Sequence, residues 1–143
     1  AKLAIADGAK EIDMVINIGY LKSRKYDLVT KEIAAVKEAC GDALLKVILE
    51  TCLLTDEEKA EGCSCAIEGG ADYVKTSTGF SLSGATARDV SVLCNLTKGK
   101  IKVKASGGMK SCEDMEMFLK LGAERLGTSS GVSLIKERMY STK

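Results

Sequence analysis

Short apolar runs alternate with amphipathic segments along this chain. Tyr26, Val29, Ile33, Val36 and Cys40 follow the three- and four-residue spacing of one buried helix face. Between such segments lie apolar runs that predict five strands, near residues 12–17, 44–50, 72–76, 101–105 and 125–128. Alternating strands and helices are typical of a parallel sheet covered by helices.

A repeated turn marks the passage from helix to strand. The pattern Gly-Ala-x-x-apolar occurs at Gly8, Gly70 and Gly122, and we expect each glycine to end a helix in a left-handed conformation. Three capping-box patterns predict helix starts several residues after a strand: Thr55-x-x-Glu58, Thr86-x-x-Asp89 and Ser111-x-x-Asp114.

Two α/β architectures fit five such units in 143 residues. A doubly wound open sheet would be complete at this length, whereas a (β/α)8 TIM barrel takes roughly 250 residues. We favour the barrel because polar residues fall at the end of every predicted strand, as a ring of loops around one mouth requires. Residues 1–143 would then form a single partial barrel domain of about five units, with the N-terminal units missing.

Composition excludes several kinds of site. The chain has no histidine, which rules out Ser-His-Asp and Cys-His nucleophilic sites and histidine metal sites within it. The net charge of +1 gives no field that would attract nucleic acid or an anionic membrane. Six cysteines, without a signal peptide or a membrane-spanning run, indicate reduced thiols in a cytoplasmic protein. Cys63 and Cys65 lack the usual zinc spacing, so we expect no metal.

Two lysines, Lys75 and Lys104, lie where apolar runs end in loops rich in glycine and hydroxyl groups. Burying an ammonium is costly unless its charge is paired or used. Amine catalysis needs such a pair, because one lysine must be neutral to attack a carbonyl and a second cation keeps it so. A second ammonium about 4 Å away would lower a lysine pKa by about 3 at an effective dielectric of about 20. Lys102 shares the face of Lys104 but lies nearer the strand's start, so we expect Lys104 to be the cation.

Two acids fall on strands beside these lysines. Asp13 alternates with Ile12 and Met14, so its carboxylate would point into the barrel, where it could compensate the lysines and pass protons through water. Glu50 has the corresponding place on the next strand and could join this network. The alternative for both acids is that they only neutralise buried cations.

Glycine turns predict an anion site. Ser106–Gly108 and Gly127–Ser130 each offer unobstructed N–H groups before a helix, and in barrels the loops after the last two strands commonly bind phosphate. Thr78 and Gly79 could add a third edge to this site.

The same residues resemble one family. Motifs similar to those of the deoxyribose-phosphate aldolase family occur in order along essentially the whole chain: Glu11–Val15, Lys46–Thr51, Val74–Phe80, Gly84–Thr86, Val103–Gly108 and Gly127–Ser130. The resemblance implies a (β/α)8 barrel and a class I aldolase, a lyase that reversibly cleaves 2-deoxy-D-ribose 5-phosphate to D-glyceraldehyde 3-phosphate and acetaldehyde. It implies a role in deoxyribonucleotide catabolism and no metal or organic cofactor.

The resemblance also implies roles for individual residues. Lys75 would be the Schiff-base lysine, Lys104 the neighbouring cation and Asp13 the carboxylate of the proton relay. Lys110 replaces the arginine expected in many relatives, and it keeps the charge without the bidentate fork. Our predicted substrate- and phosphate-binding residues are Thr76, Thr78, Gly79, Gly107, Gly108, Lys110, Gly127, Ser129 and Ser130.

Two other functions stay open at this point. One is a different lysine-dependent aldolase, and the other is an inert barrel fragment that binds a sugar phosphate. We expect a small sugar phosphate as ligand, no nucleic-acid or membrane partner, and we leave a homodimer open.

Overall fold

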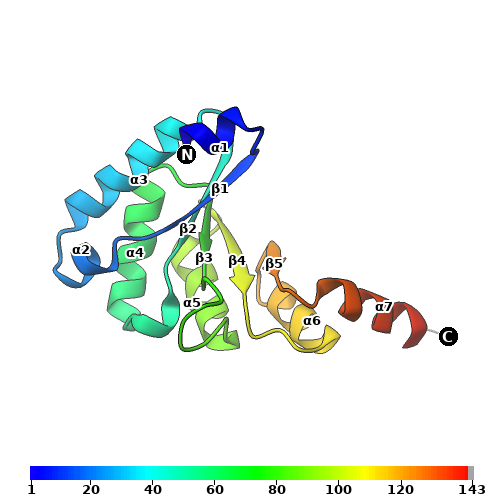
Figure 1. The fold of residues 1–143 in the computed structure, drawn as a ribbon. Helices are drawn as coiled ribbons and strands as arrows, with labels where there is room; N and C mark the ends of the chain where they lie inside the picture. Colours follow the sequence, from blue (N-terminus) through cyan, green and yellow to red (C-terminus); the bar gives the residue numbers. More distant parts are fainter. Residues whose placement is uncertain (142–143) are drawn as a thin grey trace.

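The computed structural model describes residues 1–141, which contain one sheet of five parallel strands (Figure 1). The strands are β1 (Glu11–Val15), β2 (Leu44–Ile48), β3 (Tyr73–Lys75), β4 (Lys102–Ser106) and β5 (Arg125–Gly127). They lie side by side in chain order, whereas a doubly wound sheet reverses its order at one point. The fold is therefore a partial α/β barrel, and the barrel prediction is confirmed over these five units.

The helices connect successive strands and pack on the sheet. They are α1 (Lys2–Ala6), α2 (Ile18–Lys22), α3 (Tyr26–Cys40), the short 3-10 helix η1 (Thr51–Leu53), α4 (Asp56–Glu68), α5 (Ala87–Thr97), α6 (Cys112–Lys120) and α7 (Gly131–Ser141). Helices α3 to α6 each contact the strand that follows them. Helix α7 extends away from the sheet at the C-terminal end (Figure 1).

The predicted helix boundaries are confirmed, with one difference. Reciprocal capping boxes form at Thr55 and at Ser111. Thr86 also caps its helix, accepting a hydrogen bond from the N–H of Asp89. The Asp89 carboxylate is instead bound by the ammonium of Lys59, 2.7 Å away.

Left-handed glycines end the helices, as the repeated turn predicts. The φ angles of Gly8, Gly70 and Gly122 are 99°, 80° and 108°. Each turn thereby returns the chain from a helix to the start of the next strand.

The two faces of the sheet differ, because apolar side chains face the helices and most of the charged side chains of the strands lie on the other face. Leu45, Val47 and Val74 are fully buried under the helices, and Ile12 and Met14 pack against the same core. Since side chains alternate along a strand, the intervening residues project from the inner face. Every strand places at least one charged residue on this inner face, and β1 and β2 also place the apolar Val15 and Ile48 there. Among the described residues, no helix is both long enough and apolar enough to cross a membrane.

Helices α3 and α4 approach closely at Gly69, the residue that ends α4. A Cβ atom added there would lie 2.6 Å from Cγ2 of Ile33, a side chain that is completely buried. The backbone of Gly69 is right-handed helical, so the requirement for glycine is steric.

We expect Gly69→Ala to lower the free energy of unfolding by about 1 to 3 kcal/mol, because the buried Ile33 has to shift. The measurement is urea denaturation of the full-length protein. The control is Gly19→Ala in α2, where the new methyl meets only Asn17 Oδ1 at 3.5 Å. Alanine should there stabilise the helix by about 0.5 to 1 kcal/mol. Equal effects of the two substitutions would contradict the steric explanation.

Candidate active site

Strand register brings the predicted catalytic lysines together. Lys75 of β3 pairs in register with Lys104 of β4, and adjacent strands are about 4.8 Å apart. Both side chains project from the inner face and are largely buried, with 12% and 16% exposed. Lys102 lies two residues before Lys104 on the same face of β4. Its side chain is 54% exposed, and its ammonium pairs with Glu124. The expectation that Lys104, and not Lys102, neighbours Lys75 is confirmed.

Asp13 is the centre of the charge cluster. Its Oδ2 atom lies 2.8 Å from Nζ of Lys75 and 3.7 Å from Nζ of Lys104. The prediction that this carboxylate points toward the two lysines is confirmed. The side chain is 30% exposed, and β1 is an edge strand of the described sheet.

Sequence reasoning missed a third lysine, Lys46 of β2. Its ammonium lies 2.8 Å from Asp13 Oδ1 and 2.8 Å from Glu11 Oε2, and its side chain is 4% exposed. Glu11 also forms an ion pair with Arg125 of β5. The signal was a single lysine inside the apolar run Leu44–Ile48, which the parallel register places beside Asp13.

The cluster changes the proton affinities of its members. Partial burial alone would raise the pKa of Asp13, but hydrogen bonds from Lys46 and Lys75 and the charges of Lys75 and Lys104 outweigh it and lower the pKa to about 2. Burial lowers the pKa of Lys104, and the charge of Lys75 adds to this effect against the attraction of Asp13. The site thus combines a permanently ionised carboxylate with an amine that releases its proton more readily.

A hollow of about 460 Å³ opens above the lysines. Its lining comes from the ends of three neighbouring strands: Lys75, Thr78–Phe80, Lys104, Ser106–Met109 and Gly127–Ser129. Gly107 and Gly108 both have left-handed backbone angles, with φ of 74° and 77°, and the N–H of Gly107 donates to the carbonyl of Gly127. The hollow is therefore lined by both amines and glycine turns.

Gly127 keeps the floor of this hollow open. A Cβ atom there would lie 2.6 Å from Oγ of Ser106 and 3.1 Å from Cε of Lys104. Within the described residues, the buried Ser106 hydroxyl has no hydrogen-bond partner.

Three predicted binding residues lie outside the lining of the hollow. Thr76 is completely buried, and its hydroxyl donates to the carbonyl of Ser106 and accepts from its N–H, so it braces β3 against β4. The N–H of Lys110 donates to Asp114 at the start of α6. Ser130 lies at the start of α7, where its carbonyl accepts from Leu134 N–H. The other six predicted binding residues line the hollow.

Glu50 does not join the lysine network. It is 4% exposed and has left-handed backbone angles, φ 55° and ψ 62°. Its carboxylate accepts hydrogen bonds from the hydroxyl and the N–H of Thr78. Glu50 therefore anchors the loop that forms one wall of the hollow.

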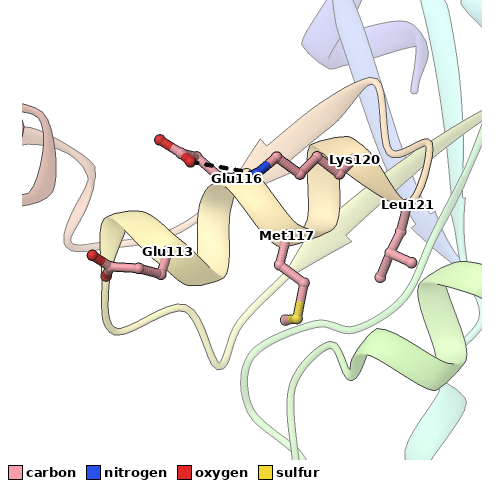
Figure 2. A pocket seen from close by; sticks show the side chains of 5 residues that line it. All are labelled: Glu113, Glu116, Met117, Lys120 and Leu121. Atoms are coloured by element: carbon pink, nitrogen blue, oxygen red, sulfur yellow. Dashed lines mark ion pairs between the residues drawn. The ribbon is translucent and has the colours of Figure 1, made fainter.

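A second hollow lies on the outer surface of α6, lined by Glu113, Glu116, Met117, Lys120 and Leu121 (Figure 2). Its charged pair is Glu116 with Lys120, one helical turn apart at 3.8 Å. Such exposed pairs occur on many solvated helices, and this hollow is remote from the amine cluster. We therefore place the candidate site at the inner-face hollow.

Comparison with known proteins identifies relatives along nearly the whole chain. The family model described as DeoC/LacD family aldolase matches residues 1–137. The chain is 57% identical over 135 residues to a deoxyribose-phosphate aldolase of Lysinibacillus sphaericus, covering 94% of this chain and 60% of the relative. It is 56% identical over 132 residues to that of Brevibacillus brevis, covering 92% and 60%.

Solved structures share the fold. QR15, an aldolase, superposes with a TM-score of 0.93 at 42% identity, covering 97% of this chain and 63% of that one. The tetrameric deoxyribose phosphate aldolase of Aeropyrum pernix superposes with a TM-score of 0.82 at 36% identity, covering 92% and 56%. The chain thus spans about three fifths of the length of the relatives that it matches.

We expect Asp13 to make the free energy of unfolding depend on acid pH. Its folded-state pKa of about 2 lies below the ordinary value of 3.8. The stabilisation is therefore complete above about pH 4 and is lost as the pH falls toward about 2. Urea denaturation of the full-length protein should show the difference between wild type and Asp13→Asn shrinking over this range. Asp7→Asn, which removes a carboxylate at an exposed position, is the control. A constant difference for Asp13→Asn would contradict the interpretation.

Proposed function

Because the chain belongs to the DeoC/LacD family of aldolases, we propose that the protein it represents is a class I aldolase. Its reaction is the reversible cleavage of 2-deoxy-D-ribose 5-phosphate to D-glyceraldehyde 3-phosphate and acetaldehyde. The observation that carries this proposal is the convergence of Lys75 and Lys104 on Asp13 at the floor of a hollow with glycine turns.

Lys75 is the nucleophile in this proposal. Its neutral amine attacks the C1 carbonyl of the open-chain sugar, and loss of water gives the iminium ion. Removal of the C3 hydroxyl proton breaks the bond between C2 and C3, releases glyceraldehyde 3-phosphate and leaves an enamine. Protonation at C2 and addition of water to the iminium then release acetaldehyde and free Lys75.

Asp13 and Lys104 serve the proton transfers. An ionised carboxylate accepts protons directly or through water, and Asp13 stays ionised at neutral pH because its pKa is about 2. Lys104, whose pKa is lowered by burial and by Lys75, can exchange a proton more readily than a solvated lysine.

The glycine turns accept the substrate's phosphate. Gly107, Gly108, Gly127 and Ser129 line the hollow together with the lysines, and backbone N–H groups in glycine turns suit an anion. Thr78 and Gly79 complete the wall. Lys110, Ser130 and Thr76 act from outside the lining, Lys110 by charge and the other two by fixing the loops.

The biological setting belongs to the same proposal. The substrate's sugar places the enzyme in deoxyribonucleotide breakdown, with a homo-oligomer as its assembly. The six cysteines are all free thiols, which suits the cytoplasm. The five units described here would be part of an eight-unit barrel in the whole protein.

We expect acetaldehyde and borohydride to attach a two-carbon group to Lys75, because reduction traps its imine. Peptide mass spectrometry of the full-length protein locates the label. Lys75→Met should abolish the labelling, whereas Lys102→Met, at the exposed end of β4, should preserve it. Labelling mainly on Lys104 or Lys46 would overturn the assignment. Cleavage of another aldol substrate in preference to deoxyribose 5-phosphate would favour a different lysine-dependent aldolase.

We expect Gly127→Ala to reduce kcat/KM for 2-deoxyribose 5-phosphate by about 10- to 100-fold, because the new methyl displaces Lys104 and Ser106. Steady-state kinetics of the full-length enzyme measure this. Gly19→Ala, in a helix away from the hollow, serves as the control and should stay close to wild type. A fully active Gly127→Ala enzyme would show that this close approach does not position the amine.

A further inference from the structure

Lys46 is a buried cation without a role in the scheme above. It lies on β2 between apolar neighbours, and its ammonium bridges Glu11 and Asp13 of β1 at 2.8 Å each. A buried ammonium is costly unless it is paired, and here both partners are carboxylates on the adjacent strand. Its contacts are therefore specific, and one of them is with the carboxylate proposed for proton transfer.

The two oxygen atoms of Asp13 have separate partners. Oδ1 accepts from Lys46, whereas Oδ2 lies within 2.8 Å of Lys75 and 3.7 Å of Lys104. The carboxylate projects from an edge strand and is partly exposed, so the strand alone would leave it free to turn toward solvent. In the described part of the chain, three lysines contact Asp13. Lys46, which binds Oδ1, is the one that has no part in the proposed reaction.

A chain of ion pairs in turn holds Lys46. Arg125 of β5 binds Glu11, and Glu11 binds Lys46. Burial alone would lower the pKa of Lys46, but the hydrogen bonds that its ammonium donates to both carboxylates outweigh this effect and raise the pKa. Lys46 therefore remains a cation at neutral pH and does not compete with Lys75 for the carbonyl.

We propose that Lys46 is a positioning residue of the aldolase site, which holds Asp13 by Oδ1 so that Oδ2 stays directed at Lys75 and Lys104. This inference rests on the proposed function. Lys46 itself touches no reacting atom, and its effect passes entirely through Asp13.

The role of Lys46 has a signature in the titration of Asp13. Charged groups from all five strands surround this carboxylate: Glu11 of β1, Lys46 of β2, Lys75 of β3, Lys104 of β4 and Arg125 of β5, with the Tyr73 ring beside Arg125. Burial raises the pKa of Asp13, and the hydrogen bond from Lys46 is the largest effect that opposes it. Removing that bond raises the pKa, while Lys75 and Lys104 continue to lower it.

The chain offers a matched control in Lys59. This lysine of α4 is 6% exposed and lies between two carboxylates, 2.7 Å from Asp89 and 3.3 Å from Asp56. Lys59→Met therefore breaks a comparable buried pair, but on the helical layer outside the sheet. The loss of stability should be similar in Lys46→Met and Lys59→Met. A difference in kcat between the two variants would therefore reflect the location of each lysine relative to Asp13.

The test compares both variants and Lys46→Arg in the full-length enzyme, by thermal denaturation and by kcat and KM for 2-deoxyribose 5-phosphate. We expect Lys46→Met to lower kcat by about 100-fold with little change in KM, because a misplaced catalytic group slows the step it serves. Lys59→Met should keep kcat close to wild type. Lys46→Arg keeps the charge but moves the donor, and should fall about tenfold below wild type.

A carboxyl-carbon NMR titration of Asp13 in the same proteins gives a second readout. We expect its pKa to rise in Lys46→Met and to stay unchanged in Lys59→Met. Equal kcat in Lys46→Met and Lys59→Met, or an unmoved Asp13 titration, would overturn the role of Lys46. If Lys46→Met does not fold, Lys46→Arg decides, and wild-type kcat in that variant would overturn the role.

Failure of the proposed function would look different. An inactive wild-type enzyme that forms no trapped imine with acetaldehyde would refute the aldolase, and with it the reaction that Lys46 serves. An active wild type in which the lysine variants behave alike would refute only the positioning role.

Discussion

The shared carboxylate of Asp13 is the contact on which the inner face of this sheet depends. Three ammonium groups, from three successive strands, lie within 4 Å of its two oxygen atoms. Without an anion among them, like charges at such separations would repel by several kcal/mol in a partly buried setting. A single carboxylate thus offsets the repulsion among Lys46, Lys75 and Lys104 and allows the three ammonium groups to lie together.

The charges of this cluster do not cancel. In the described part of the chain, four cations (Lys46, Lys75, Lys104 and Arg125) face two carboxylates (Glu11 and Asp13). The surplus of positive charge favours loss of a proton from an amine. In the proposed aldolase, the same surplus attracts the anionic substrate for which the adjacent glycine turns are suited. In that proposal, activation of the amine and attraction of the phosphate share one electrostatic origin.

Sequence patterns predicted the parts of the site that depend on local signals. Lys75 and Lys104 were identified because they lie where apolar runs pass into glycine-rich loops, and the two-residue period of a strand placed Asp13 on the inner face. The sheet order followed from alternating units with polar ends, and the structure bears this out. The sequence was therefore sufficient to identify residues whose placement depends only on their own strand and the loop that follows it.

Properties that depend on pairing between strands were less accessible. Lys46 looks like an interruption of an apolar run until the register sets it beside Asp13. Glu50 has the right strand position to join the lysines, but its left-handed backbone turns it to the Thr78 loop. Thr76 belongs to a loop motif, yet its hydroxyl is used between strands. In each case the side chain's partner comes from a distant segment, and sequence spacing carries no record of it.

The ion pair between Arg125 and Glu11 joins residues 114 positions apart. During folding such a contact forms only after the intervening units have assembled. Closing a long loop costs chain entropy, and the contact can offset that cost only once it has formed. Glu11 is also a ligand of Lys46, which holds Asp13. Assembly of β5 is thereby coupled to the ordering of the lysines around Asp13. A chain that has not finished folding therefore exposes these lysines without the arrangement that the proposed reaction with carbonyl groups requires.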